Sequence, residues 1–505
     1  MAVVEGVFSL SGVLLALVLL LVLYVISAGE RSSKSSLEPP EPPGPTPLPL
    51  LGNLLSLDLK KTHSSLCELA RQYGPVFTVY LGPKKVVVLA GYRAVKEALV
   101  TQAEAFEDRD ITPVFHDLNQ GHGLIFSNGS NWRSMRRFSL AVLRDLGMGR
   151  SSSQQRILDE ARHLLDTFSN YKGEPFDTSA PLNYAASNVI SSIVYGTRFS
   201  LDDPYFTRMV QRANHNFKLS GSASMQVYNL FPAIGRWVRN REQLVRNSKE
   251  NQLDMSSLIG RLRDSLNPAD CRGFVDAFIM RQHTEQKAAG GSEPVFHEKN
   301  LVNCVSNLFS AGTDTTGTTL RWALLLMAKY PHIQERVHEE LERVIGSRLP
   351  VADDRRLLPV TDAVLHETQR LANVFPMSLP HRTTQDVNIM GYRIKKGTSV
   401  FPLLASVLND ETEWEEPNRF HPEHFLDADG GFRKRDAFMP FSAGRRVCLG
   451  EALAKMELFL IFVSLLQRFR FTAPPGVSEE ELDLTPVVGS TLNPPPHKLC
   501  ALPRT

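Results

Sequence analysis

The sequence predicts a mainly α-helical protein with a smaller β region, folded as one large domain behind an N-terminal transmembrane helix. Three observations support this fold class. Apolar residues recur at helical spacing through most of the chain, and only residues 75–91 and 386–404 are rich in strand-forming residues. Residues 7–28 are uncharged and mostly apolar. We therefore expect three parts: an anchor over 1–29, a proline-rich hinge over 30–53 and a folded body over 54–505.

The N-terminal apolar segment is long enough to cross a membrane. As a helix, residues 7–28 would span roughly 33 Å, close to the thickness of a bilayer core. A cleaved signal peptide is the alternative, but its apolar part is usually shorter and follows a basic start. Here only Glu5 precedes the segment, and Arg31 and Lys34 follow it. The positive-inside rule then places the body in the cytosol.

Proline-rich sequence follows the anchor over residues 37–53, "LEPPEPPGPTPLPLLGN". Proline fixes φ and prevents helix formation, so this stretch is expected to be a stiff spacer, with an SH3-type ligand as the alternative. The body has no comparable break, although its length exceeds the about 250–300 residues of a usual single core. A bound cofactor could help to fill so large a core.

Local signals assign the elements of the body in order. Residues 62–74 form an amphipathic helix that ends at a glycine, and 75–91 form a hairpin about Gly82 and Pro83. Further helices are expected at 92–102, 152–169, 184–195, 272–286 and 296–330, and a second strand region at 386–404.

The 56 basic and 54 acidic residues give a net charge of +2, so nothing global points to nucleic acid. The five cysteines have no paired spacing, which fits a reducing compartment. Cys67, Cys271, Cys304 and Cys500 are expected to act as small buried hydrophobes.

Cys448 lies in a different context, between Gly444 and Gly450 and just before a helical run. A helix N-terminus favours the thiolate, and a single thiolate suits a haem iron with one protein ligand. A buried, inert cysteine remains the alternative on these residues alone.

A long apolar helix over 308–331 is interrupted by Asp314 and Thr315 beside Gly312. Polar residues and glycine loosen helices, so a widened turn with room for a ligand is expected there, with an acid and a hydroxyl to move protons. A solvent-facing polar stripe is the alternative. Two weaker signals are helical pairs on one face: Glu367 with Arg370, and Trp132 with Arg136.

Taken together, the segments "FSAGRRVCLG" (441–450), "AGTDTT" (311–316), "ETQR" (367–370) and "EPNRF" (416–420) resemble the cytochrome P-450 superfamily of haem-thiolate monooxygenases. The anchor and "PPGPTPLPLLGN" are similar to its microsomal class. Three further segments resemble vertebrate family 2, including fish members: "FSNGSNWRSMRRFSL", "LPHRTTQD" and "FHPEHFLD".

The resemblance implies a role for each matched residue. Cys448 is implied as the proximal ligand of heme b, in a loop shaped by Phe441, Gly444 and Gly450. Asp314 and Thr315 are implied to deliver protons. The haem propionates are expected at Arg109, Trp132, Arg136, His381 and Arg446. A buried structural triad is expected of Glu367, Arg370 and Arg419. Substrate-lining positions are expected at Phe126, Ala311, Thr315, Phe375, Leu379, Ser490 and Thr491.

The implied reaction inserts one oxygen atom of O₂ into a lipophilic fatty acid, steroid or xenobiotic. NADPH supplies the electrons through a reductase, with cytochrome b5 as a further partner, on the cytosolic side of the endoplasmic reticulum membrane. Residues 217–235 match a membrane-touching lid, with Leu230, Phe231 and Pro232 in contact with lipid. A basic docking face for the reductase is expected at Arg133, Arg137, Lys434, Arg435 and Arg445. A reductase-independent isomerase or synthase and a haem sensor are the alternatives, and intact Asp314–Thr315 argues against both.

Overall fold

The structure is a computed structural model that describes residues 12, 39–148, 151–288 and 295–504. Apart from residue 12, the expected transmembrane segment 7–28 lies outside the described residues. Within the described ranges, no helix combines the length and the apolar character needed to cross a bilayer.

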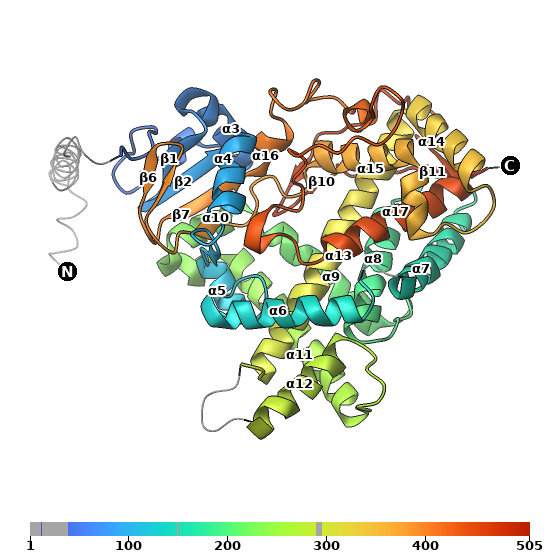
Figure 1. Ribbon diagram of the computed structural model, residues 1–505, viewed down its shortest axis with the longest axis horizontal. Coiled ribbons are helices and arrows are strands. Elements are labelled where there is room, and N and C mark those ends of the chain that lie inside the picture. Colours follow the sequence, from blue (N-terminus) through green and yellow to red (C-terminus); the bar gives the residue numbers. More distant parts are fainter. Residues whose placement is uncertain (1–11, 13–38, 149–150, 289–294, 505) are drawn as a thin grey trace.

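Helices make up most of the described chain; the strands β1, β2 and β7 lie beside them at one end of the molecule, and β11 lies at the opposite end (Figure 1). The class expected from the sequence, mainly α with a smaller β region, is therefore confirmed. The α-helices are α3 Thr62–Tyr73, α4 Gly91–Lys96, α5 Pro113–Asn119, α6 Gly129–Asp145, α7 Ser151–Ser169, α8 Ser179–Val194, α9 Pro204–Ser220, α10 Ala223–Leu230, α11 Arg239–Asp264, α12 Phe274–Ala288, α13 Glu298–Lys329, α14 Pro331–Val344, α15 Pro359–Ala372, α16 Leu404–Leu408 and α17 Glu451–Arg468. The shorter turns are the π-helical η3 Glu97–Thr101 and the 3-10 helices η2 Leu54–Ser56, η4 Pro232–Trp237, η5 Ala352–Leu357, η6 Pro422–Phe425 and η7 Gly444–Arg446.

The main sheet has the strand order β1-β2-β7-β4-β3. Strands β1 and β2 form the expected antiparallel hairpin, with Val76 opposite Leu89 and Leu81 opposite Lys84. Strand β7 lies parallel to β2, and β4 joins β3 to it. The strands are β1 Val76–Leu81, β2 Lys84–Ala90, β3 Asp108–Arg109, β4 His381–Arg382, β5 Val387–Ile389, β6 Tyr392–Ile394, β7 Ser399–Leu403, β8 Phe469–Thr472, β9 Val487–Val488, β10 Leu492–Asn493 and β11 Cys500–Pro503.

Element boundaries follow the local signals closely. Helix α3 ends at Gly74, whose φ of 91° suits glycine and whose N–H reaches the Ala70 carbonyl. Helix α8 begins at Ser179, earlier than the expected start at 184, because Pro181 falls in the first turn, where proline is tolerated.

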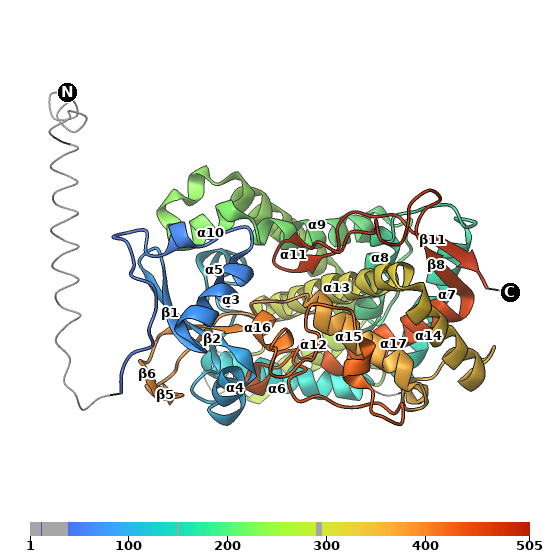
Figure 2. The same ribbon diagram turned by 90° about the horizontal axis from the view of Figure 1, so that it is seen from above.

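Helix α13 crosses the middle of the molecule between the layer of α9 and α11 and the layer of α15 and α17 (Figure 2). It is α-helical throughout, so the widened turn expected near Asp314 is wrong for this structure. The polar residues do not open the helix: Thr313 and Thr315 each donate to the carbonyl four residues earlier, at 2.8 Å. Their polar groups are thus satisfied on the helix itself.

The largest hydrophobic cluster joins buried side chains from Leu124 to Ala501, through α8, α13 and α17. A second cluster lies against the sheet and includes Leu99, which touches the cysteine loop.

Candidate functional site

The loop before α17 holds Cys448 by backbone contacts. The Cys448 N–H donates to the Phe441 carbonyl at 3.0 Å, and Gly444 opens the short turn η7 with φ 73°. A Cβ at Gly444 would lie 1.7 Å from the Leu99 carbonyl oxygen, so only glycine fits. Gly450 is the N-cap of α17, and a Cβ there would meet no other atom within 4 Å. Contacts within the protein therefore explain why residue 444 is a glycine, but they give no reason for a glycine at 450.

The Cys448 side chain is accessible, yet burial raises its pKa. The Gly450 N–H and the Arg136 charge act in the opposite direction and favour the thiolate. The thiol is therefore surrounded by protein atoms but remains accessible. Cys304 and Cys500 are buried, as expected for small hydrophobes, whereas Cys271 is exposed and that expectation is wrong for it.

Five residues from distant parts of the chain meet near this loop. The Arg446 guanidinium stacks 3.6 Å from the centre of the Trp132 ring, and Arg136 lies 5.9 Å from the same centre. Arg136 also donates to the Val447 carbonyl at 2.7 Å, and Arg109 lies 2.7 Å from His381 Nε2. The sequence-predicted propionate residues are therefore brought together by α6, β3, β4 and η7.

This cluster is a concentration of buried positive charge. Burial, followed by the charge of Arg109, lowers the pKa of Arg446, and burial followed by Arg136 does so for Arg109. Arginine keeps its proton in proteins, so the cluster remains cationic. The nearby Glu107 carboxylate is already engaged by Arg133 and Arg445.

Three buried N–H groups of the cluster have no acceptor among the residues described: Trp132 Nε1, Arg109 Nε and Arg446 Nη1. Buried donors without partners are rare and costly, and so are buried charges without counter-charges. A ligand carrying two carboxylates would satisfy both needs. The residues present therefore fit a haem, with its propionates at this cluster and its iron at Cys448.

Asp314 is almost fully buried on α13. Its carboxylate accepts a hydrogen bond from Thr491 Oγ1 at 2.9 Å. Burial raises the pKa of Asp314 to about 6, against the opposing effects of Thr491, Arg321 and Lys218. A group with this pKa can exchange protons near neutral pH. The Thr491 contact was missed from the sequence, because 177 positions separate the two residues.

Most expected substrate-lining residues are half-buried: Ala311, Thr315, Phe375, Leu379 and Ser490. Phe126 is buried and stacks on Phe115, with ring centres 3.7 Å apart. Thr491 is only 1% exposed, and its hydroxyl is occupied by Asp314 and Asn493. The predicted lid 217–235 comprises the end of α9, α10 and the start of η4. In it Leu230 and Phe231 are half-buried and Pro232 is exposed.

The expected buried triad differs in its third member. Arg370 donates two hydrogen bonds of 2.7 Å to the Glu367 carboxylate, and both side chains are inaccessible. The prediction for Arg419 is wrong: its side chain is 76% exposed and pairs with Glu416, and only its carbonyl accepts from Arg370. His424 lies 3.1 Å from Glu367 instead. No signal in the sequence marks this inward position, because His421 lies between the same two phenylalanines, Phe420 and Phe425, and its side chain is 37% exposed.

Three of the five residues expected to form a basic docking face are paired within the protein. Arg133 and Arg445 pair with Glu107, and Arg445 also pairs with Glu104. Arg435 is 11% exposed, pairs with Glu415 and lies over the Trp414 ring, so its assignment to a docking surface is wrong. Arg137 and Lys434 are exposed and form no ion pair with any residue that the structure describes.

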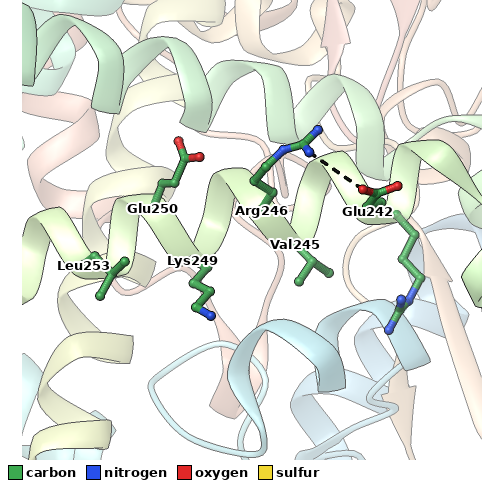
Figure 3. A pocket seen from close by; sticks show the side chains of 7 residues that line it. Glu242, Val245, Arg246, Lys249, Glu250 and Leu253 are labelled. Atoms are coloured by element: carbon green, nitrogen blue, oxygen red, sulfur yellow. Dashed lines mark ion pairs between the residues drawn. The ribbon is translucent and has the colours of Figure 1, made fainter.

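A shallow pocket on the outer face of α11 is lined by alternating charges, among them Glu242 paired with Arg246 (Figure 3). It contains none of the residues discussed above. Its lining is a solvated helix face with one exposed leucine, Leu253, and we assign it no role.

Comparison with known proteins defines the class. The family model described as Cytochrome P450 matches residues 42–501, and the chain belongs to this family of haem-dependent, haem-thiolate monooxygenases. The resemblance noted in the sequence is thereby confirmed.

Its relatives include fish and mammalian members of family 2. The chain is 59% identical to cytochrome P450 2K1 of Oncorhynchus mykiss, over 96% of this chain and 95% of the relative. It is 57% identical to cytochrome P450 2K6 of Danio rerio, over 91% and 90%. It is 46% identical to cytochrome P450 2B4 of Oryctolagus cuniculus, over 90% and 92%.

Proposed function

We propose that this monooxygenase inserts one oxygen atom of O₂ into a lipophilic organic substrate, a fatty acid, steroid or xenobiotic, and releases the other as water. NADPH–cytochrome P450 reductase supplies the electrons, with cytochrome b5 as a second donor. Residues 1–29 anchor the chain once in the endoplasmic reticulum membrane, 30–53 form the hinge, and 54–505 face the cytosol. The observation that supports this proposal most strongly is the cluster beside Cys448 of buried arginines and Trp132, whose N–H groups lack partners among the described residues.

In this proposal Cys448 is the thiolate ligand of heme b. Trp132, Arg109 and Arg446 donate their free N–H groups to the propionates, Arg136 adds charge, and His381 orients Arg109. His381 is neutral, because burial and the Arg109 charge lower its pKa well below the usual value. Gly444 allows the loop to close on Leu99, and Gly450 keeps the helix start open. The bound haem supplies the iron chemistry that reduces dioxygen.

Asp314 and Thr315 deliver the protons that the reaction consumes. Release of water from O₂ requires two protons and two electrons besides the oxygen transferred to substrate. With a pKa of about 6, Asp314 holds a proton in part of the population at neutral pH and can be recharged. The Thr315 hydroxyl donates to the Ala311 carbonyl at 2.8 Å, which holds its oxygen in a fixed place on the same helix.

The substrate is proposed to lie among Phe126, Ala311, Phe375 and Leu379. Apolar and aromatic lining of this kind favours lipophilic compounds. A titration of haem-loaded protein with fatty acids, steroids and aromatic xenobiotics measures the spectral shift that accompanies displacement of water from the iron. Shifts with none of the three classes would contradict the proposed substrates.

A membrane contact is proposed for the lid face at Leu230, Phe231 and Pro232. Trp237 in η4 and Leu50 in the hinge are 66% and 69% exposed and extend the apolar surface available to lipid. This surface and the hinge lie on the same part of the molecule, since the Phe231 ring and the Leu50 carbonyl both approach Gly82.

The central experiment is the carbon monoxide difference spectrum of the reduced protein. Thiolate ligation gives a strongly red-shifted Soret band, which we expect in the native protein and in Cys304→Ala, a control at a buried cysteine. Cys448→Ala should lose the band. Survival of the band in Cys448→Ala, or its absence from folded, haem-loaded native protein, would overturn the assignment. Turnover that needs NADPH and reductase separates a monooxygenase from an isomerase or a sensor.

A further inference from the structure

The β9–β10 hairpin lies between two parts of the proposed site: the lid and the proton-delivering acid. Residues 489–491 form its tip between the paired strands, with Leu492 opposite Val488 and Asn493 opposite Val487. The hairpin is also fixed to the core, because Trp322 Nε1 donates to the Leu492 carbonyl at 3.0 Å and Leu492 N donates to the Val374 carbonyl at 2.9 Å.

On one side, Thr491 commits its only hydroxyl proton to the acid. Asn493 Nδ2 donates to Thr491 Oγ1 at 3.0 Å, so that oxygen already receives one hydrogen bond. A threonine hydroxyl has one proton to donate. That proton therefore points to Asp314 Oδ2, 2.9 Å away. Asn493 is in turn oriented by Thr318 Oγ1 at 3.1 Å and Arg321 Nη1 at 3.2 Å.

Two cations also face Asp314, but they act through space. Arg321 lies on α13 itself and is shared with Asp177, and Lys218 lies on α9, at the start of the lid. Thr491 is the residue through which the hairpin touches the acid directly. The orientation of the carboxylate thus depends on where the hairpin holds this hydroxyl.

On the other side, the tip of the hairpin contacts the lid. Ser490 N donates to the Phe217 carbonyl at 3.2 Å, and the Ser490 and Ser220 hydroxyl oxygens are 2.7 Å apart. The two backbones meet at Gly221 and Gly489, where a Cβ on Gly221 would lie 2.1 Å from the Gly489 carbonyl carbon. No side chain separates the lid from the hairpin at this point.

We propose that Thr491 is a positioning residue through which the β9–β10 hairpin couples the placement of the lid to the placement of Asp314. A shift of the lid at 217–221 moves Gly489 and Ser490, and Thr491 is the next residue along the chain. A hydrogen bond weakens steeply outside its short range of distance and angle, so a small shift releases the carboxylate. The inference rests on the proposed role of Asp314 in proton delivery.

The first test is an infrared pH titration of the Asp314 carboxyl group in the haem-loaded protein. The band is assigned by its loss in Asp314→Asn. In Thr491→Val the carboxylate loses a donor, so the midpoint should rise by about one pH unit, tenfold in proton affinity. Thr491→Ser should restore the native midpoint, and Thr368→Val, which removes a buried hydroxyl on α15, should leave it unchanged.

Asn493→Ala is made in parallel, because it leaves Thr491 and Asp314 in place and removes the amide that orients the hydroxyl, together with the oxygen that accepts from Thr318 and Arg321. It should give a smaller rise in the same direction. An unchanged midpoint in either Thr491→Val or Asn493→Ala would overturn the positioning role. If Thr491→Val does not fold, Asn493→Ala alone decides the outcome.

The second test concerns the lid. Gly221→Ala suits the backbone there, whose φ is −84°, so its effect comes from pushing the lid away from Gly489. Its Asp314 midpoint should move by at least half a pH unit. Gly260→Ala in α11, where a Cβ meets no atom within 4 Å, is the matched control and should show no shift. Equal midpoints in the two variants would contradict the coupling.

The ratio of product formed to NADPH consumed separates this inference from the proposed function. We expect Thr491→Val to lower the ratio at least twofold, with a changed dependence on pH, and Thr491→Ser to restore it. A shifted midpoint with an unchanged ratio would support the positioning of Asp314 by Thr491 and contradict the proposed role of Asp314 in the reaction.

Discussion

Glu367 and Arg370 show how burial turns a common helical pair into a structural one. Both side chains are inaccessible, and Arg370 also donates to the carbonyls of Leu408 and Pro417. The Arg370 guanidinium thereby links α15 to the end of α16 and to the loop that follows it. Removing one partner leaves the other charge buried and unpaired, which is far more costly than losing an exposed pair.

Glu367→Gln should therefore lower the free energy of unfolding by about 3–5 kcal/mol. Arg419→Ala is the matched control: its exposed ion pair with Glu416 contributes about 0–1 kcal/mol. Urea unfolding of the haem-loaded variants measures both. Comparable losses in the two variants would show that Arg419, and not His424, completes the buried group.

Asp314 gives a pH dependence of stability whose sign follows from its raised pKa. Between the usual value of 3.8 and the folded value of about 6, the folded state binds a proton that the unfolded state does not. Stability contributed by this group is therefore present below pH 4 and is lost as the pH rises to about 6.

Replacing the acid should remove this dependence. The difference in unfolding free energy between Asp314→Asn and the native protein should change by about 1.4 kcal/mol per pH unit in that window, in favour of the variant as the pH rises. Guanidinium unfolding at pH 4.5, 5.5 and 6.5 measures it. A difference that is constant over the three pH values would place the carboxyl in a solvated environment.

At the scale of elements, helix α13 holds the loop between α5 and α6, residues 120–128, by side-chain amides. Asn307 Oδ1 accepts from the backbone of Leu124 at 2.9 Å and of Ile125 at 3.1 Å. This loop carries Phe126, and its next residues, Ser127 and Asn128, accept hydrogen bonds from Arg446. One asparagine on α13 thus holds the loop that carries both a proposed substrate contact and two acceptors of Arg446.

Asn307→Leu should leave the buried N–H of Leu124 without an acceptor, at about 1–3 kcal/mol, and the partly buried N–H of Ile125 as well. We expect faster hydrogen–deuterium exchange over residues 123–128 in the haem-loaded protein. Thr319→Val, further along the same helix, is the control, because the Thr319 hydroxyl donates only to the Thr315 carbonyl of its own helix. Equal exchange over 123–128 in the two variants would contradict the proposed hold of Asn307 on this loop.

Element positions were largely predictable because they depend on local signals. Helix α3 with its glycine cap and the β1–β2 hairpin follow from periodicity and turn residues. The interior of α13 was not predicted correctly, because the sequence does not reveal that Thr313 and Thr315 satisfy their hydroxyls on the helix backbone. Whether such residues loosen a helix depends on what packs around them.

At the scale of the whole molecule, the surface available to a redox partner is defined by which basic residues are already paired. Arg133, Arg445 and Arg435 are engaged within the protein, whereas Arg137 and Lys434 are not paired among the described residues. Unpaired surface cations steer an acidic partner and do so less as salt screens them.

Lys434→Glu and Arg137→Glu should each slow reduction by the reductase several-fold at low ionic strength and flatten its salt dependence. Lys249→Glu, an exposed change on α11, is the control. Arg435→Glu should instead destabilise the fold, since it breaks the contacts to Glu415 and Trp414. Stopped-flow reduction at several salt concentrations measures the first effect, and unaltered rates in both variants would remove these residues from the docking surface.

The sequence by itself determined the family, the likeness to family 2, the fold class and the residues of the cysteine loop, because these depend on motifs at fixed spacing. Only the tertiary structure decided which distant residues meet. It brought Arg109, Trp132 and Arg446 together, each with a buried N–H group that has no partner among the described residues. It also placed His424 rather than Arg419 beside Glu367, and Thr491 beside Asp314. Spacing along a chain specifies local geometry, whereas burial and pairing depend on how whole elements pack.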